Sequence, residues 1–134
     1  MAPGNVEVVR SLFDAQWRGD ERAMLEPISP EIVVTQFPDQ LDARAFEGHD
    51  GVRQAMRDWI GTWDDWTIEL IRATEIDGHV LAIAVQRGRG KASGAPIEGE
   101  VAFVFSFRDG LIVRWQMFRT EPEALAALSG GEAA

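Results

Sequence analysis

The first half of the chain carries apolar residues at the spacing of amphipathic α-helices. Residues 5–18 and 49–63 each place an apolar side chain every three or four positions, which predicts two helices with one buried face each. Asn5 is the expected N-cap of the first helix, and Gly19 is its expected end. The two stripes are Val6, Val9, Phe13 and Trp17, and Val52, Met56, Trp59, Ile60 and Trp63.

Between these two helices the pattern changes twice. Asp20 is placed to cap a short second helix, which Pro27 and Pro30 end. The β-branched and apolar run at 31–37 predicts a strand, and the polar stretch at 38–47 is expected to be irregular.

The second half of the chain predicts long strands. Asp77-Gly78 and Asp109-Gly110 are two-residue hairpin signals, because both positions of such a turn need positive φ. A third turn at 91–96 completes an antiparallel meander. The predicted strands cover residues 66–76, 79–91, 97–108 and 111–119.

Two local signals refine this picture. Gly88 and Gly90 predict a bulge or a sharp bend within one strand. Thr120 and Glu123 have the spacing of a capping box, which predicts a final helix at 121–128.

These elements define one α+β domain over residues 1–134. Three helices of the N-terminal half must bury their stripes on one face of the sheet. We therefore expect a cone-shaped, curved antiparallel sheet wrapped by these helices, with a short C-terminal helix. The helices cannot fill a long, bent sheet throughout, so an apolar pocket should open at one end. Order is expected over about 5–128, followed by a frayed tail.

The amino-acid composition and net charge limit the classes of molecule that the protein is expected to bind. Thirteen basic and 22 acidic residues give a net charge of −9, which disfavours nucleic acid and anionic membranes. The chain has no cysteine. His49 and His79 lack partners at metal-ligand spacing, so no metal and no cofactor is expected. No apolar run resembles a signal peptide or a membrane span, and a cytoplasmic location is the resulting expectation.

Five stretches carry a family resemblance: Val8–Phe13 leading to Gly19-Asp20, Phe46–Arg53, Arg89–Gly94, Phe107–Trp115 and Glu123–Leu125. In this order they resemble the SnoaL-like proteins, of the superfamily shared by nuclear transport factor two, ketosteroid isomerase and limonene epoxide hydrolase. The resemblance covers about residues 5–128 and implies the fold. It does not define one function, because the superfamily includes isomerases, hydrolases, cyclases, dehydratases and noncatalytic binding proteins.

The resemblance also indicates where relatives keep catalytic groups. Gln36 stands at the position of the carboxylate base of ketosteroid isomerase. Leu12 or Phe13 replaces its phenolic donor, and Phe103 replaces its protonated carboxylic acid. An amide has no useful basicity near pH 7, and Leu or Phe cannot stabilise an oxyanion. Steroid isomerisation by that mechanism is therefore excluded.

The last predicted strand departs from two other relatives. SnoaL cyclases and limonene epoxide hydrolases place acid or base carboxylates on the last strands, and residues 115–120 contain none. The Asp-Arg-Asp pattern of the hydrolases cannot be assembled from this segment. Whether the chain is an enzyme therefore stays open.

Strand alternation and the helical stripes predict a ligand pocket, although plain core packing is the alternative for each aromatic residue. Arg119 could hold a carboxylate or enolate oxygen, or form a surface ion pair with Glu121 or Glu123. Gln36 could orient a carbonyl or hydroxyl group. The predicted pocket residues are Phe13, Trp17, Gln36, Met56, Trp59, Ile60, Trp63, Phe103, Phe105, Trp115, Met117 and Arg119.

Strand alternation also assigns the two faces of the sheet. Its inward set is Val101, Phe103, Phe105 and Phe107, then Leu111, Val113, Trp115, Met117 and Arg119. Its outward set is Ala102, Val104, Ile112 and Phe118, with Ala82 and Ala84 as further candidates. An apolar outer face predicts a homodimer packed sheet against sheet.

Several charged residues have no fixed assignment from the sequence. Arg87, His49 and Glu69 can each face the pocket or the solvent. The acidic pairs Asp64-Asp65 and Glu98/Glu100 are expected to be solvated.

The leading hypothesis is a SnoaL-like protein that binds a hydrophobic small molecule in an apolar pocket lined by Trp and Phe. Isomerase, cyclase or lyase chemistry on a carbonyl compound is compatible with it. The alternative is a noncatalytic, dimeric module for ligand binding or protein interaction.

Overall fold

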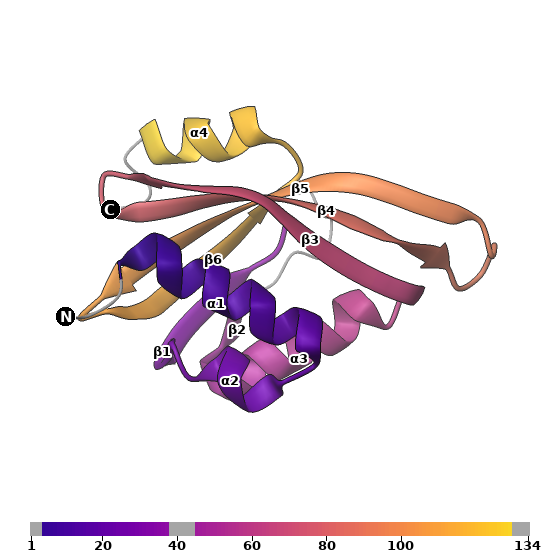
Figure 1. The fold of residues 1–134 in the computed structure, drawn as a ribbon, viewed down its shortest axis with the longest axis horizontal. Helices are drawn as coiled ribbons and strands as arrows, with labels where there is room; N and C mark the ends of the chain where they lie inside the picture. Colours follow the sequence, from indigo (N-terminus) through magenta and orange to yellow (C-terminus); the bar gives the residue numbers. More distant parts are fainter. Residues whose placement is uncertain (1–3, 38–44, 130–134) are drawn as a thin grey trace.

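The computed structural model describes residues 4–37 and 45–129. In these ranges the chain forms four helices and six strands, in the order α-α-β-β-α-β-β-β-β-α (Figure 1). The elements are α1 (Asn5–Arg18), α2 (Glu21–Leu25), β1 (Ile28–Thr35), β2 (Ala45–Glu47), α3 (Gly48–Ile60), β3 (Trp63–Ile76), β4 (His79–Gly90), β5 (Pro96–Arg108), β6 (Leu111–Phe118) and α4 (Glu121–Ser129).

One curved, unclosed sheet holds these strands in the order β2-β1-β6-β5-β4-β3. The predicted meander of β3 to β6 is confirmed. The expectation of a wholly antiparallel sheet is wrong at one pair, because β1 runs parallel to β6. Strand β2 lies in a stretch that we expected to be irregular, and it pairs with β1. The rest of that stretch, residues 38–44, lies outside the described residues, as does the predicted tail beyond Ser129.

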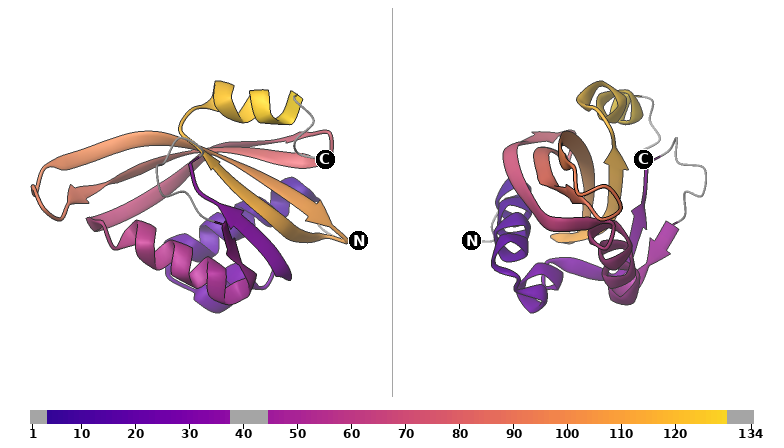
Figure 2. Two further views of the ribbon diagram at one scale, coloured as in Figure 1. Left: turned by 180° about the vertical axis from the view of Figure 1, so that it is seen from behind. Right: turned by 90° about the vertical axis from the view of Figure 1, so that its right-hand side faces the viewer.

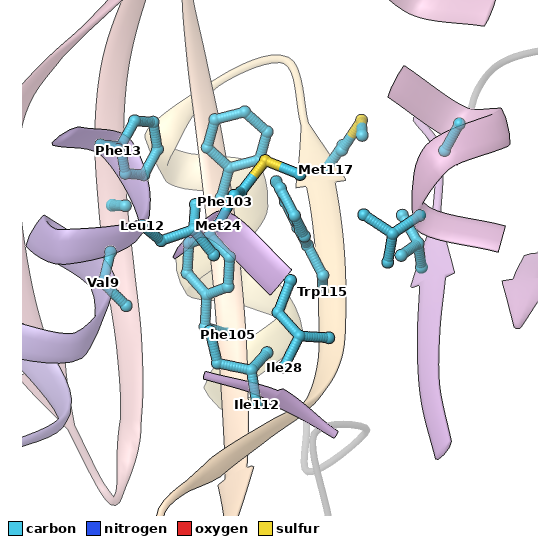
Figure 3. Close-up of a cluster of buried hydrophobic side chains, with 14 of the residues drawn as sticks. Val9, Leu12, Phe13, Met24, Ile28, Phe103, Phe105, Ile112, Trp115 and Met117 are labelled. Atoms are coloured by element: carbon cyan, nitrogen blue, oxygen red, sulfur yellow. The ribbon is translucent and has the colours of Figure 1, made fainter. Parts of the chain in front are cut away.

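Helices cover both faces of this sheet (Figures 1 and 2). α1, α2 and α3 pack on the concave face and α4 packs on the opposite face. The concave side holds the larger core, in which residues of α1 such as Val9 and Leu12 meet β5 and β6 (Figure 3). The α+β cone predicted from the pattern is therefore confirmed.

Several predicted end signals are confirmed, and one is wrong. Gly19 ends α1 with φ of 70°, and the Asp20 carboxylate accepts a hydrogen bond from the backbone N–H of Ala23. Asn5 is the first residue of α1 rather than its N-cap. Gly4 occupies the cap, and the Asn5 amide lies 3.5 Å from the carbonyl oxygen of Gly78.

The predicted turn signals are also confirmed. Both residues of Asp77-Gly78 and of Asp109-Gly110 have positive φ. In the capping box, the Glu123 backbone N–H donates to Thr120 Oγ1 at 3.3 Å, and the Thr120 N–H donates to Glu123 Oε1 at 3.2 Å.

Bulges in β3 and β6 account for two differences from the predicted strand pattern. In β3, the register shifts between Asp64 and Thr67, opposite Gly88. Gly88 therefore correctly predicted the position of a bulge, but the extra residue lies in β3 and not in β4, the strand that contains the glycine. In β6, the register shifts so that Val113 is the extra residue. This turns Ile112 inward, with no exposed surface, whereas Leu111 is exposed.

The outer face of the sheet is apolar, as predicted, but this chain covers much of it itself. Ala82 and Ala84 belong to the inner core, and their neighbours Leu81 and Ile83 face outward. These outward residues pack with Ala102, Val104 and Phe118 beneath Ala124, Ala127 and Leu128 of α4. The homodimer stays a prediction, and the apolar area on which it was based is largely buried by α4.

An ion pair joins α4 to the sheet edge. The Arg72 guanidinium of β3 donates two hydrogen bonds to the Glu121 carboxylate, one of them at 3.1 Å. These bonds hold the pKa of Glu121 below its ordinary value of 4.5. A depressed carboxyl pKa stabilises the fold above that ordinary value, and the stabilisation is lost as the pH falls through the folded-state pKa.

We therefore expect Glu121→Gln to lower the melting temperature at pH 7 and to make little difference at pH 3. Glu75→Gln, at an exposed position of the same strand β3, is the matched control and should change little at either pH. Equal melting temperatures of wild type and Glu121→Gln at pH 7 would show that the pair does not hold α4.

Candidate functional site

A small, partly open cavity lies between α1, α3 and the concave face of the sheet. The centre of a water-sized sphere can reach about 30 Å³ of it, which is space for one or two water molecules. Figure 3 shows part of its wall, where Leu12 and Phe13 of α1 face Phe103, Trp115 and Met117. The central cavity is lined by Leu12, Phe13, Gln16, Phe37, Met56, Trp59, Trp66, Ile68, Gln86, Val101, Phe103, Trp115 and Met117.

Aromatic rings form much of this wall. The Phe103 and Trp115 rings meet edge to face with centroids 5.9 Å apart, and Phe13 packs against Phe103 at the same distance. On the other side, Phe37 and Trp59 lie 5.3 Å apart. Such separations are in the favourable range for aromatic pairs. The rings therefore form a rigid, apolar wall.

Gln86 is the polar centre of the cavity. Its side chain is 5% exposed, and its carbonyl oxygen accepts hydrogen bonds from two indole N–H groups, those of Trp59 and Trp66. Because an amide oxygen accepts and an amide nitrogen only donates, the two indoles fix the orientation of the amide. Within the described ranges the amide NH₂ has no hydrogen-bond partner.

Trp115 contributes a second donor. Its side chain is 4% exposed, and its buried indole N–H has no acceptor among the described residues. A buried N–H without a partner costs about 1–3 kcal/mol. An acceptor placed in the adjoining cavity would remove this cost.

No ionisable side chain lines the central cavity in the described part of the chain. His49 hydrogen-bonds the carbonyl oxygen of Ile28 at 2.7 Å, and His79 lies 2.9 Å from Ser106 Oγ. Arg87 pairs with Glu69 at 3.1 Å on the exposed side of the sheet. The charged residues left open by the sequence therefore lie outside the cavity.

The acidic pairs of the sequence also lie in solvent. Glu98 is exposed and pairs with Arg87 at 3.2 Å, and Asp64 lies 3.5 Å from the ammonium group of Lys91. The described ranges hold no group of three His, Cys, Asp or Glu side chains that could bind a metal ion. None of their helices is long and apolar enough to span a membrane.

The structure brings six of the twelve predicted pocket residues to the cavity and places six elsewhere. The six that line it are Phe13, Met56, Trp59, Phe103, Trp115 and Met117. Phe105 is fully buried behind Trp115, with ring centroids 5.1 Å apart. Trp63 belongs to β3 and packs on Trp59 at 6.1 Å, because α3 ends at Ile60.

The remaining predicted residues lie outside the wall. Trp17 is 65% exposed, and Ile60 lines shallow surface hollows. Gln36 is half-buried, beyond the end of β1. Arg119 is exposed and stacks its guanidinium 4.4 Å from the centroid of the Phe37 ring, so Phe37 separates it from the cavity.

Sequence reasoning missed Gln86, Gln16 and Trp66. The available signal for Gln86 was the alternation Val80, Ala82, Ala84, Gln86 on the inner face of β4. Its interleaved partners Leu81 and Ile83 are also apolar, so alternation alone did not distinguish the two faces. Trp66 lies in the β3 bulge, where a simple alternation fails.

Gln16 and Met56 mark the access to the cavity. Both also line a surface hollow of about 170 Å³ near the end of α1. Gln16 and Trp66 line a second hollow of about 220 Å³. Both Gln16 and Met56 are half-buried, unbranched side chains. These two side chains therefore lie between the central cavity and the surface hollows.

An α+β cone whose helices and curved sheet enclose an apolar cavity defines the class of nuclear transport factor two-like proteins. The model of the SnoaL-like domain matches residues 9–115. The chain belongs to the SnoaL-like family. No curated protein sequence matches it.

Solved structures agree with this fold. An NTF2-like protein of Burkholderia thailandensis superposes with a TM-score of 0.79 at 24% identity, over 95% of this chain and 98% of that chain. A protein described as a SnoaL-like polyketide cyclase from Jannaschia sp. gives 0.73 at 17% identity, over 96% and 97%. TerC, co-crystallised with polyporic acid, gives 0.74 at 12% identity, over 93% and 98%.

The hydrogen bonds to Gln86 should contribute strongly to stability. Gln86→Met keeps the length of the side chain but leaves the indoles of Trp59 and Trp66 without their acceptor. We expect a loss of about 2–4 kcal/mol in the free energy of unfolding, since each buried unsatisfied donor costs about 1–3 kcal/mol. Urea denaturation measures this loss.

Gln54→Met, at an exposed position of α3, is the control and should change stability by less than about 0.5 kcal/mol. If Gln86→Met unfolds at the same urea concentration as Gln54→Met, the hydrogen bonds to Gln86 do not hold the site together.

Proposed function

We propose that this protein binds a neutral, hydrophobic small molecule in the central cavity. The proposal is based on the composition of the cavity wall. The wall combines aromatic and aliphatic side chains with indole and amide groups, and in the described ranges it has no ionisable side chain. Binding sites for small organic molecules are typically apolar, with a few oriented polar groups.

The same wall favours binding over proton-transfer catalysis. Acid–base chemistry needs a titratable group within hydrogen-bond reach of the substrate. Leu12, Phe13 and Phe103, at the positions where ketosteroid isomerase keeps its donors, all line the cavity as apolar residues. Isomerase, cyclase or lyase activity on a carbonyl compound would have to depend on positioning alone.

The size of the cavity sets a condition on the ligand. The present space holds one or two water molecules, so a ring compound requires the access residues Gln16 and Met56 to turn outward. Two proteins of similar fold have been crystallised with small organic molecules. TerC was co-crystallised with polyporic acid, and a ketosteroid isomerase-like protein from Catenulispora acidiphila was crystallised with trimethylamine.

Nuclear magnetic resonance tests the proposal directly, because each tryptophan gives one indole N–H signal. Titration with a panel of neutral bicyclic compounds, with indane as its simplest member, should shift the signals of Trp59, Trp66 and Trp115 in a saturable way. The signal of the exposed Trp17 should respond least.

A matched pair of variants locates the binding. Val101→Leu adds one methylene to the cavity wall and should weaken binding by about tenfold or more, because overpacking costs about 1–3 kcal/mol. Val33→Leu adds the same group to a half-buried position of β1 that does not line the cavity and should leave binding unchanged. If no compound of the panel shifts the signals of the three indoles that line the cavity, the proposal is wrong and the noncatalytic protein-interaction alternative is favoured.

A further inference from the structure

We propose that the central cavity selects ligands that present a neutral carbonyl-type acceptor, and that the indole N–H of Trp115 and the amide NH₂ of Gln86 hold this oxygen. The inference rests on the proposed function and adds the chemical class of the ligand to it. The basis is a comparison of the hydrogen-bond donors and acceptors in the cavity wall that already have a partner with those that have none.

Of the two amide oxygens that line the cavity, that of Gln86 is already used, whereas that of Gln16 lies at the half-buried access to the cavity. The carbonyl oxygen of Gln86 has two lone pairs, and the indoles of Trp59 and Trp66 donate to it. A ligand hydroxyl or amine that reaches this point finds no free acceptor oxygen. Two indole donors also keep the amide from turning over, because its nitrogen cannot accept their protons.

The donors of the inner wall are left over. The amide NH₂ of Gln86 has no partner among the described residues, and neither has the buried N–H of Trp115. The rings nearest Trp115, those of Phe103 and Phe105, offer no acceptor oxygen. A ligand oxygen that accepts from the indole N–H of Trp115 removes the cost of an unpaired buried donor, whereas a hydrocarbon of the same shape does not.

The wall also favours a neutral acceptor over an anionic one. No Arg, Lys or His side chain lines the cavity in the described ranges. The guanidinium of Arg119 lies over the Phe37 ring, and Phe37 lines the cavity whereas Arg119 does not. A buried carboxylate without a cationic partner is costly, so ketones, quinones and related carbonyl compounds fit better than acids.

Three ligands with one bicyclic skeleton test this inference: indane, 1-indanone and 1-indanol. Dissociation constants come from calorimetric titration of the full chain. We expect 1-indanone to bind about tenfold more tightly than indane, the value of about one net hydrogen bond, and more tightly than 1-indanol. In Trp115→Phe, which removes the N–H and retains a ring, the advantage of 1-indanone over indane should fall to about threefold, because only the Gln86 amide is left to donate to the oxygen.

Trp17→Phe is the control, because the exposed Trp17 does not line the cavity, and it should retain the full advantage. If Trp115→Phe fails to fold, the affinities of the three ligands for the wild-type protein still test the carbonyl inference. Equal binding of indane and 1-indanone, or tighter binding of 1-indanol, overturns the carbonyl inference and leaves the proposed function standing. Binding of none of the three overturns both.

Discussion

The convergence of two indole N–H groups on the carbonyl oxygen of Gln86 is the interaction on which the site depends. Trp59 comes from α3, Trp66 from β3 and Gln86 from β4. One buried oxygen therefore ties the helical layer to two strands at the end of the cone where the cavity lies. Because the oxygen is saturated, the interior beside it can remain apolar without leaving these two indole donors unpaired.

Backbone geometry makes this convergence possible. The bulge in β3 lies between Asp64 and Thr67 and contains Trp66, directly opposite Gly88. A Cβ atom on Gly88 would lie 2.8 Å from Cε3 of Trp63 and 3.3 Å from Cα of Trp66. The absence of a side chain at Gly88 lets both tryptophans of β3 approach β4. The bulge and the glycine therefore allow Trp66 to lie close to β4, where its indole N–H donates to Gln86.

The sequence predicted most of the fold and about half of the cavity wall. The fold depends mainly on local signals, whereas the missed part of the wall depends on contacts that have no local signal. Helical periodicity and Asp-Gly turns are local signals, so α1, α3 and the meander followed from them. The parallel pair of β1 and β6 joins distant segments and has no local signal. The faces of β6 were inverted at Ile112 because a bulge shifts the alternation. Gln86 was missed because β4 is apolar on both faces, beneath helices on both sides.

The central claim is that ligand contacts in this cavity are uncharged, and the pH dependence of affinity tests it most directly. The dissociation constant of a neutral ligand such as 1-indanone should stay constant within about twofold between pH 5 and pH 9, because the described wall has no group that titrates in this range. A sigmoidal change of tenfold or more within that range would show that an ionisable group takes part in binding, and would contradict the account.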